Sequence, residues 1–189
     1  MTQHATALTD AEIAGIARAI DRPVVLVGLM GVGKSTVGRK LAGLLHTDFV
    51  DADAEIEEAS QLSVAEIFEQ FGEDYFRDGE RRVIARLIEE GHGVIATGGG
   101  AFVNDETRAL LKAQAITVWI DAAVETLVQR TARKSHRPLL KEGDPKEILT
   151  RLHDERAPLY AEADVRVQSD EAPHLETALR ILGAIERWM

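Results

Sequence analysis

The residues best suited to chemistry form a glycine-rich run at positions 28–36, GLMGVGKST. It fits the pattern G-x-x-x-x-G-K-[ST] and lies between an apolar segment and an amphipathic one. Glycines let successive backbone N–H groups point at phosphate oxygens, and a following helix adds its N-terminal partial positive charge. Lys34 has the reach to contact β- and γ-phosphates, and the Ser35 hydroxyl suits Mg²⁺. The predicted nucleotide-phosphate site comprises Gly31, Val32, Gly33, Lys34, Ser35 and Thr36.

Two carboxylates, Asp51 and Asp53, follow the next short apolar run. Residues two apart in an extended segment face the same side, so both side chains could point into one cleft. One carboxylate suits Mg²⁺ through water, because this ion keeps much of its hydration shell, and the other suits a substrate hydroxyl as a base. The alternative is a solvated strand end in which Asp53 caps a helix beginning AEIEEA. The spacing alone leaves both interpretations open.

Three consecutive glycines follow a third apolar run: Gly98, Gly99 and Gly100. They indicate that another group approaches the backbone closely, and the alternative is a flexible loop. Four arginines in polar surroundings are further candidates: Arg77, Arg130, Arg137 and Arg156. A single arginine is usually a solvated surface charge, and spacing does not separate these four from the others.

Alternating strands and helices must position these groups. Apolar runs predict strands at 23–28, 49–50, 93–97, 116–120 and 165–167. Capping signals and helical spacing predict helices at 34–45, 63–71, 122–133 and 175–185, another from 76 to the stop at Gly91, and another from Asp144. The pattern predicts an α/β fold of three layers, α/β/α, with a five-stranded parallel sheet. Ligands in such sheets bind at the carboxyl ends of the strands.

Composition excludes several classes of function. The chain has 189 residues and a net charge of −10, which disfavours nucleic acid and an anionic membrane as partners. The lack of cysteine excludes disulfides, thiolate zinc sites and a cysteine nucleophile. Neither a run of about 20 apolar residues nor a secretory signal pattern is present. We therefore expect a cytoplasmic protein that binds neither nucleic acid nor a membrane.

The combination of segments resembles the shikimate kinases, within the nucleoside-monophosphate-kinase-like P-loop enzymes. The matching segments are GLMGVGKSTVGRKLA, FVDADAEIE, SVAEIFEQFGEDYFRDGE, VIATGGGA, RPLL and ERAPLY, in the family's order. The glycine-rich run is common to many families, whereas the set D-x-D, F-R-x-x-E, GGG, RPLL and R-x-P-L-Y is specific. The resemblance covers about residues 23–185.

This resemblance implies roles on the ATP side of the site. Lys34 would be a catalytic residue that binds the ATP phosphates and the transferring group. Ser35 with Asp51, the latter through water, would hold one Mg²⁺ per subunit. Arg130 would lie against the adenine. Arg137 would be a catalytic residue that stabilises the phosphates in the transition state.

It also implies roles on the acceptor side. Asp53 would bind the shikimate diol and position, or deprotonate, the attacking hydroxyl. Arg77 and Arg156 would clamp the shikimate carboxylate, and Glu80 would orient Arg77. The three glycines at 98–100 would line the substrate pocket.

The implied activity is ATP-dependent phosphorylation of the 3-hydroxyl of shikimate in chorismate and aromatic amino acid biosynthesis. Residues 1–22 would be an N-terminal helical extension, and residues 23–189 a single P-loop kinase domain with a mobile lid at about 131–145. We expect a monomer with ATP and shikimate as its small-molecule partners. The alternative is a related small-molecule kinase such as a gluconate kinase. A guanine-nucleotide switch is disfavoured because the motif [NT]-K-x-D is absent from the sequence.

Overall fold

The computed structural model describes residues 8–132 and 143–189. Five strands form one sheet in the order β2-β3-β1-β4-β5. They are β1 (Val24–Val27), β2 (Phe49–Asp51), β3 (Val94–Ala96), β4 (Ile116–Asp121) and β5 (Val165–Gln168). Every neighbouring pair is parallel, and the register aligns Val24 with Val94 on one side and Ile116 on the other. The predicted five-stranded parallel sheet is confirmed.

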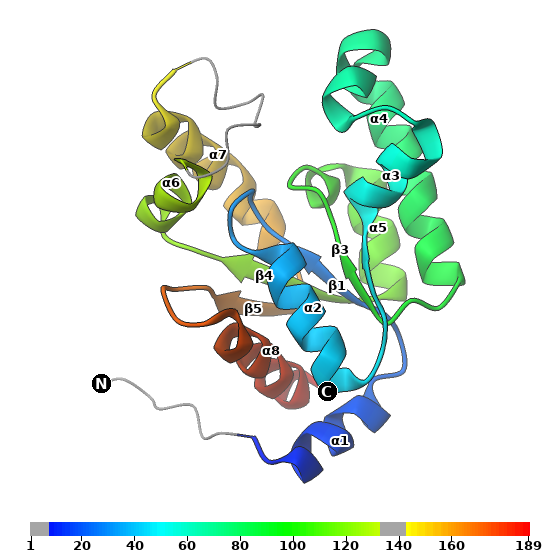
Figure 1. The fold of residues 1–189 in the computed structure, drawn as a ribbon, viewed down its shortest axis with the longest axis vertical. Helices are drawn as coiled ribbons and strands as arrows, with labels where there is room; N and C mark the ends of the chain where they lie inside the picture. The colour runs from blue at the N-terminus through cyan, green and yellow to red at the C-terminus, as the bar shows by residue number, and fades with distance from the viewer. Residues whose placement is uncertain (1–7, 133–142) are drawn as a thin grey trace.

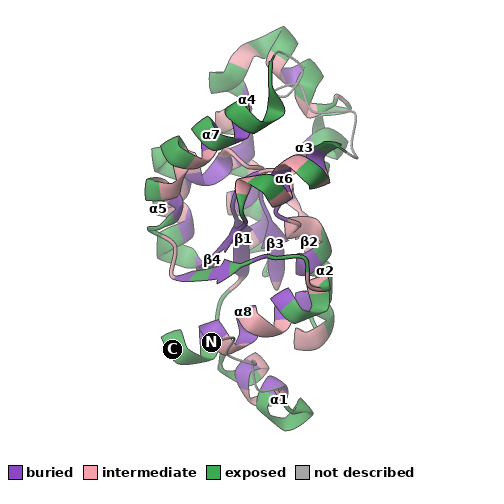
Figure 2. Ribbon diagram, turned by 90° about the vertical axis from the view of Figure 1, so that its left-hand side faces the viewer, coloured by how far each residue is buried: buried purple, intermediate pink, exposed green. Residues whose placement is uncertain are grey.

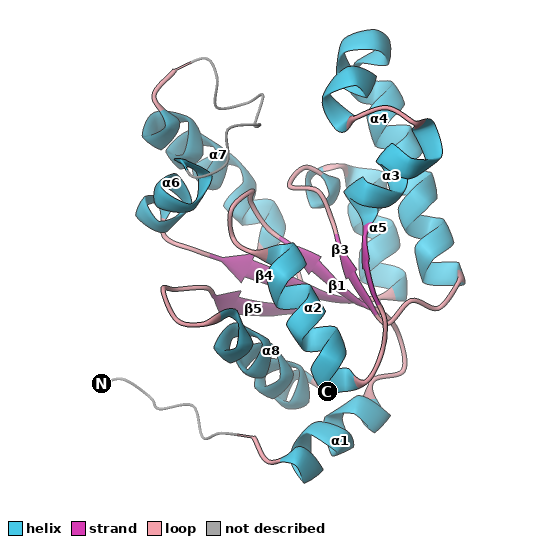
Figure 3. Ribbon diagram, viewed as in Figure 1, coloured by secondary structure: helices cyan, strands magenta, loops and turns pink. Residues whose placement is uncertain are grey.

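Helices cover both faces of this sheet (Figure 1). They are α1 (Asp10–Ala19), α2 (Lys34–Leu45), α3 (Ala52–Ser60), α4 (Val64–Glu89), α5 (Asp105–Gln114), α6 (Val124–Ala132), α7 (Pro145–Tyr160) and α8 (His174–Trp188), with a short 3₁₀ turn η1 (Ala101–Val103). One face is covered by α2 and α8, and the other by α5 together with α4 and α7 (Figure 3). These are the three predicted layers.

The three central strands explain the strongest apolar runs of the sequence. Every residue of β1, β3 and β4 is buried (Figure 2). A parallel strand with helices on both faces has no solvent side, so its sequence is continuously apolar. The edge strand β5 alternates buried and exposed residues, which is why its apolar signal is weak. No helix in the described part of the chain is long and apolar enough to cross a membrane.

The helix boundaries follow local signals in most places. Thr9 and Glu12 form a capping box at the start of α1, and Ile13 and Ile16 of this helix are buried in the core that α2 and α8 share. Two helices were predicted in the region of α4. Gly72, with φ 83° and ψ 174°, divides α4 into two helical runs. This φ lies in the region that glycine adopts at little cost.

Helix α5 was not predicted. Its available signal is the side chain of Asn104, which accepts a hydrogen bond from the backbone N–H of Thr107 as an N-cap. Leu111 is the one apolar residue among the buried residues of this helix.

The two glycines of α2 provide a test of how closely this helix packs against β2. A Cβ at Gly38 would overlap the ring of Phe49, whereas a Cβ at Gly43 meets no atom within 4 Å. We expect Gly38→Ala to lower the free energy of unfolding by about 1–3 kcal/mol through overpacking. Gly43→Ala should raise it by up to about 1 kcal/mol, because alanine favours the helix. Urea denaturation measures both, and equal effects of the two substitutions would contradict the packing described.

Candidate active site

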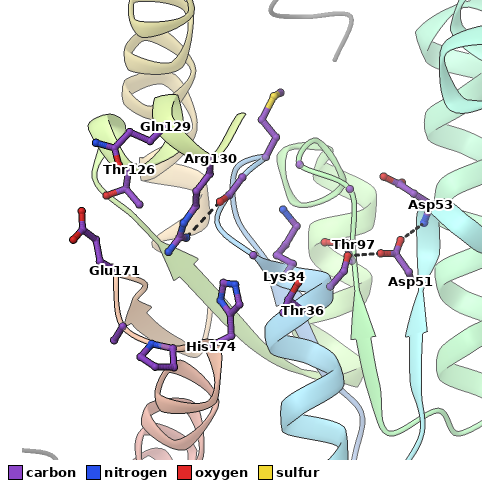
Figure 4. Close-up of a pocket in the computed structure, with 18 residues that line it drawn as sticks. Lys34, Thr36, Asp51, Asp53, Thr97, Thr126, Gln129, Arg130, Glu171 and His174 are labelled. Carbon is purple, nitrogen blue, oxygen red and sulfur yellow. Dashed lines mark hydrogen bonds between the residues drawn. The ribbon is translucent and has the colours of Figure 1, made fainter. Parts of the chain in front are cut away.

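A cleft of about 970 Å³ opens at the carboxyl ends of the strands (Figure 4). This is the edge of the sheet at which ligands are expected. The lining residues are Met30, Gly31, Gly33, Lys34, Ser35, Thr36, Asp51, Asp53, Thr97, Gly98, Gly99, Thr126, Gln129, Arg130, Glu171, Ala172, Pro173 and His174. The cleft therefore gathers the predicted phosphate loop, both carboxylates and the start of the glycine run.

The phosphate loop ends in the first turn of α2. Gly33 is the N-cap residue with φ 96°, and no side chain among the described residues caps the helix. Gly33 and the first-turn residues Lys34 and Ser35 line the cleft, so the positive end of the helix faces it. The Nζ of Lys34 donates hydrogen bonds to the carbonyl oxygens of Gly28 at 2.7 Å and Leu29 at 2.9 Å. The ammonium group is thereby held over its own loop.

Ser35 and Asp51 meet beside this helix end. The hydroxyl of Ser35 donates to Oδ2 of Asp51 at 2.5 Å. The other carboxylate oxygen, Oδ1, accepts from the backbone N–H groups of Asp53 at 3.1 Å and Ala54 at 3.4 Å. Asp51 is therefore the N-cap of α3 as well as a lining residue.

This cap corrects two expectations about the carboxylates. Asp51 and Asp53 do not share an extended segment, because the cap starts α3 at Ala52. The alternative, in which Asp53 is the cap, is also wrong, since Asp53 lies inside the first turn. Both side chains nevertheless line the cleft, as predicted. The cause is the helix cap and first turn of α3, in place of the extended segment on which the prediction was based.

Asp53 lies in an environment that disfavours its charge. Its Oδ1 is buried and has no hydrogen-bond partner among the described residues. Burial, followed by the neighbouring charge of Asp51, raises the pKa of Asp53, while Lys34 opposes the shift. A Cβ at Gly98 would lie 2.8 Å from Asp53 Oδ1. Glycine at this position is what lets the carboxylate approach the backbone.

Arg77 and Glu80 form a buried pair behind the glycine loop. Nη1 of Arg77 donates to Oε2 of Glu80 at 2.6 Å, and the Glu80 side chain is fully buried. Burial raises the pKa of Glu80 to about 7, although Arg77 opposes the shift. A Cβ at Gly100 would overlap the guanidinium of Arg77. Close approach to the glycine run was predicted, and it is confirmed here and at Gly98.

The opposite side of the glycine loop is held by α7. Nη1 of Arg156 donates to the carbonyl oxygen of Gly99 at 3.3 Å, and the hydroxyl of Tyr160 donates to the same oxygen at 2.5 Å. Arg77, Gly100 and Arg156 are not among the residues that line the cleft. Gly100 is the last residue of the glycine loop, and the two arginines lie against this loop.

Arg130 links the phosphate loop to the segment before α8. Its Nη1 donates to the carbonyl of Val32 at 3.3 Å and to Oγ of Ser169 at 3.1 Å, and its Nη2 donates to the carbonyl of Asp170 at 2.5 Å. Arg137 lies outside the described residues. So does most of the predicted lid, of which residues 131–132 end α6 and Pro145 begins α7.

Several lining residues were missed from the sequence. Two of them, Thr126 and Gln129, lie on α6 with Arg130. Thr126 is four residues before Arg130, so the two share one face of the helix. His174, the first residue of α8 after the β5–α8 segment, has a buried Nδ1 without a partner among the described residues, and burial followed by Arg130 lowers its pKa. The rule that ligands bind after strand ends would have pointed to this segment.

Comparisons with known proteins agree with this arrangement. The family model for shikimate kinase matches residues 30–186. The chain belongs to the shikimate kinase family. It is therefore an ATP-using kinase. The shikimate kinase of Novosphingobium aromaticivorans is 56% identical over the whole of both chains. That of Caulobacter vibrioides is 54% identical, with 88% of this chain and 83% of the relative covered.

Solved structures give the same assignment. The shikimate kinase of Acinetobacter baumannii, solved in complex with shikimate, superposes with a TM-score of 0.84 at 39% identity, covering 90% of this chain and 97% of that one. A gluconokinase from Sinorhizobium meliloti reaches a TM-score of 0.59 at 16% identity, covering 89% and 93%. The second likeness shows the fold alone.

The buried Glu80 predicts a pH dependence of stability. Its pKa is about 7 in the folded chain against an ordinary value of 4.5, so the unfolded chain loses this proton at lower pH. Stability should therefore fall as pH rises from about 4.5 to 7. We expect the free energy of unfolding, relative to Glu80→Gln, to be about 2 kcal/mol lower at pH 8 than at pH 5.

Urea denaturation of the two proteins at both pH values measures this difference. Other titrating groups are shared by both proteins, so their contributions largely cancel. A constant difference between the wild type and Glu80→Gln across this range would show that Glu80 does not titrate as described.

Proposed function

We propose that this cleft transfers the γ-phosphate of ATP to the 3-hydroxyl of shikimate, in chorismate and aromatic amino acid biosynthesis. The observation that carries the proposal is the meeting of a phosphate loop with an unpartnered buried carboxylate, that of Asp53, in one cleft. The hydroxyl oxygen forms a bond to the γ-phosphorus while the bond to the β–γ bridging oxygen breaks. The products are shikimate 3-phosphate and ADP.

The phosphate loop is proposed to hold the donor. Backbone N–H groups of residues 31–36 and the positive end of α2 favour the phosphate oxygens. Lys34 would exchange its contacts with the carbonyls of Gly28 and Leu29 for phosphate oxygens, since it is placed over the same loop. Arg130 would lie against the adenine at the far end of the cleft. Such positioning and charge neutralisation supply most of the catalysis in phosphoryl transfer.

One Mg²⁺ per subunit is proposed at Ser35 and Asp51. The two side chains bring a hydroxyl and a carboxylate oxygen within 2.5 Å of each other, and hard oxygen donors are the ligands that this ion prefers. Ser35 would bind directly and Asp51 through water. When bound, the ion would neutralise negative charge on the transferred phosphate.

The acceptor side is proposed to be built around Asp53. A carboxylate with a raised pKa and an unsatisfied oxygen is suited to accept a hydrogen bond, and then the proton, from the attacking hydroxyl. Gly98, Gly99 and Gly100 would line the pocket beside it. Arg77 and Arg156 would bind the shikimate carboxylate, because a planar guanidinium can donate two parallel hydrogen bonds to it.

We further propose a cytoplasmic monomer that acts on small molecules and binds neither nucleic acid nor a membrane. The net charge of −10 supports the lack of nucleic-acid and membrane binding, since phosphate-rich surfaces repel an acidic chain. The likeness to a gluconokinase, at 16% identity, gives no support to gluconate as the acceptor.

Release of ADP from Mg-ATP tests the function directly. We expect turnover with shikimate to exceed, by orders of magnitude, the rate with gluconate and the rate without an acceptor. The reason is that only shikimate offers both a diol to Asp53 and a carboxylate to the arginines. Equal rates in the three reactions would refute the proposed activity.

Asp53→Asn tests the proposed base. The amide keeps the size of the side chain but cannot take a proton, so kcat should fall at least about 100-fold. The affinity for ATP, measured by calorimetry, should remain within about twofold because the phosphate loop is unchanged. Near-normal turnover would remove Asp53 from the mechanism.

A further inference from the structure

A second polar cluster lies at the end of β4, outside the cleft. Its centre is the carboxylate of Asp121, whose side chain is 7% exposed. Oδ1 accepts from the backbone N–H of Ala122 at 2.9 Å and lies 3.2 Å from Nε2 of His153. Oδ2 accepts from Nη2 of Arg166 at 2.6 Å. Because a carboxylate only accepts, Nε2 of His153 carries the hydrogen.

The three side chains of this cluster come from three elements that are distant in sequence. Asp121 belongs to β4, His153 to α7 and Arg166 to β5. A buried carboxylate is unfavourable unless it is paired and hydrogen-bonded, so the three elements are held together at this point. The guanidinium of Arg166 also lies 4.4 Å from the centre of the Trp119 ring. The cluster is thus a fixed attachment of α7 to the sheet.

The attached face of α7 is the face that reaches the glycine loop. His153, Arg156 and Tyr160 are spaced by three and four residues, so they lie along one side of the helix. Arg156 and Tyr160 both donate to the carbonyl oxygen of Gly99. One side of α7 is therefore held at the end of β4 and, one to two turns later, at the loop after β3.

Apolar packing alone does not fix this orientation. Leu149 and Leu152 of α7 are buried and hold the helix against the core. Burial of apolar surface is non-directional, whereas hydrogen bonds weaken steeply when their angle changes. The contact between His153 and Asp121 therefore restricts rotation of α7 about its own axis, and rotation would displace Arg156 from Gly99.

We propose that His153, held by Asp121, is a positioning residue for Arg156 and so for binding of the acceptor carboxylate. This rests on the proposed function, in which Arg156 contacts shikimate. His153 does not touch the substrate. Trp119 provides a second connection between this cluster and α7. Its ring lies under the guanidinium of Arg166, and its ring centre is 5.8 Å from the ring centre of Tyr160.

Steady-state kinetics of His153→Ala and His153→Gln test the proposal. His153→Ala should raise KM for shikimate about three- to tenfold, the size expected for one lost hydrogen bond, and leave KM for ATP unchanged. His153→Gln should restore most of the loss, because its amide N–H can reach Asp121. Glu155→Gln, at an exposed position of the same helix, is the control and should match the wild type.

A double-substitution cycle separates positioning from general stability. In an Arg156→Ala background, His153→Ala should raise KM for shikimate no further, because the group that it positions is gone. A multiplied effect in the double variant would overturn the proposal. So would an unchanged KM for shikimate in His153→Ala, even if its melting temperature falls. Failure of the proposed function is distinct, since the wild type would then not phosphorylate shikimate.

Discussion

Five side chains from three helices converge on a loop of three glycines. Asp53 from α3 and Glu80 from α4 approach Gly98, Arg77 from α4 lies against Gly100, and α7 donates two hydrogen bonds to the carbonyl of Gly99. A side chain at Gly98 or Gly100 would displace the groups that approach it, whereas a Cβ at Gly99 would make only ordinary contacts. The proposed acceptor side of the cleft therefore depends on the absence of side chains at Gly98 and Gly100, after the end of β3.

The same convergence explains the electrostatics of the site. Bringing Asp53 and Glu80 against one backbone segment removes both carboxylates from water, which raises their pKa values. Arg77 pairs with Glu80 and opposes its shift, and its charge opposes the shift of Asp53 as well. Each of the two carboxylates keeps one buried oxygen without a hydrogen-bond partner among the described residues, but only Asp53 lines the cleft. The carboxylate of Asp53 therefore favours binding a proton or accepting a hydrogen bond.

The fold was largely predictable because its signals are local. Strands buried on both faces give continuous apolar runs, and the phosphate loop is a single contiguous pattern. Asp51 and Asp53 show the limit, since their shared cleft was predicted but the cap at Asp51 replaces the extended geometry. The roles of Arg77 and Arg156 could not come from spacing, because their meeting at the glycine loop is created by tertiary contacts. His174 was missed for the same reason, since it reaches the cleft from the start of the last helix.

The two halves of the cleft are consequently built in different ways. The proposed donor half is formed by residues 28–36 with the helix that follows, a contiguous segment that Arg130 contacts from α6. The proposed acceptor half is assembled from α3, α4, α7 and the loop after β3, and each contact closes a long stretch of chain. Small rotations of α4 or α7 would alter the proposed acceptor half directly, because its hydrogen bonds come from these helices. Packing far from the cleft can therefore act on the proposed acceptor half more directly than on the phosphate loop, which receives no hydrogen bond from either helix among those described between Arg77, Arg156 or Tyr160 and their partners.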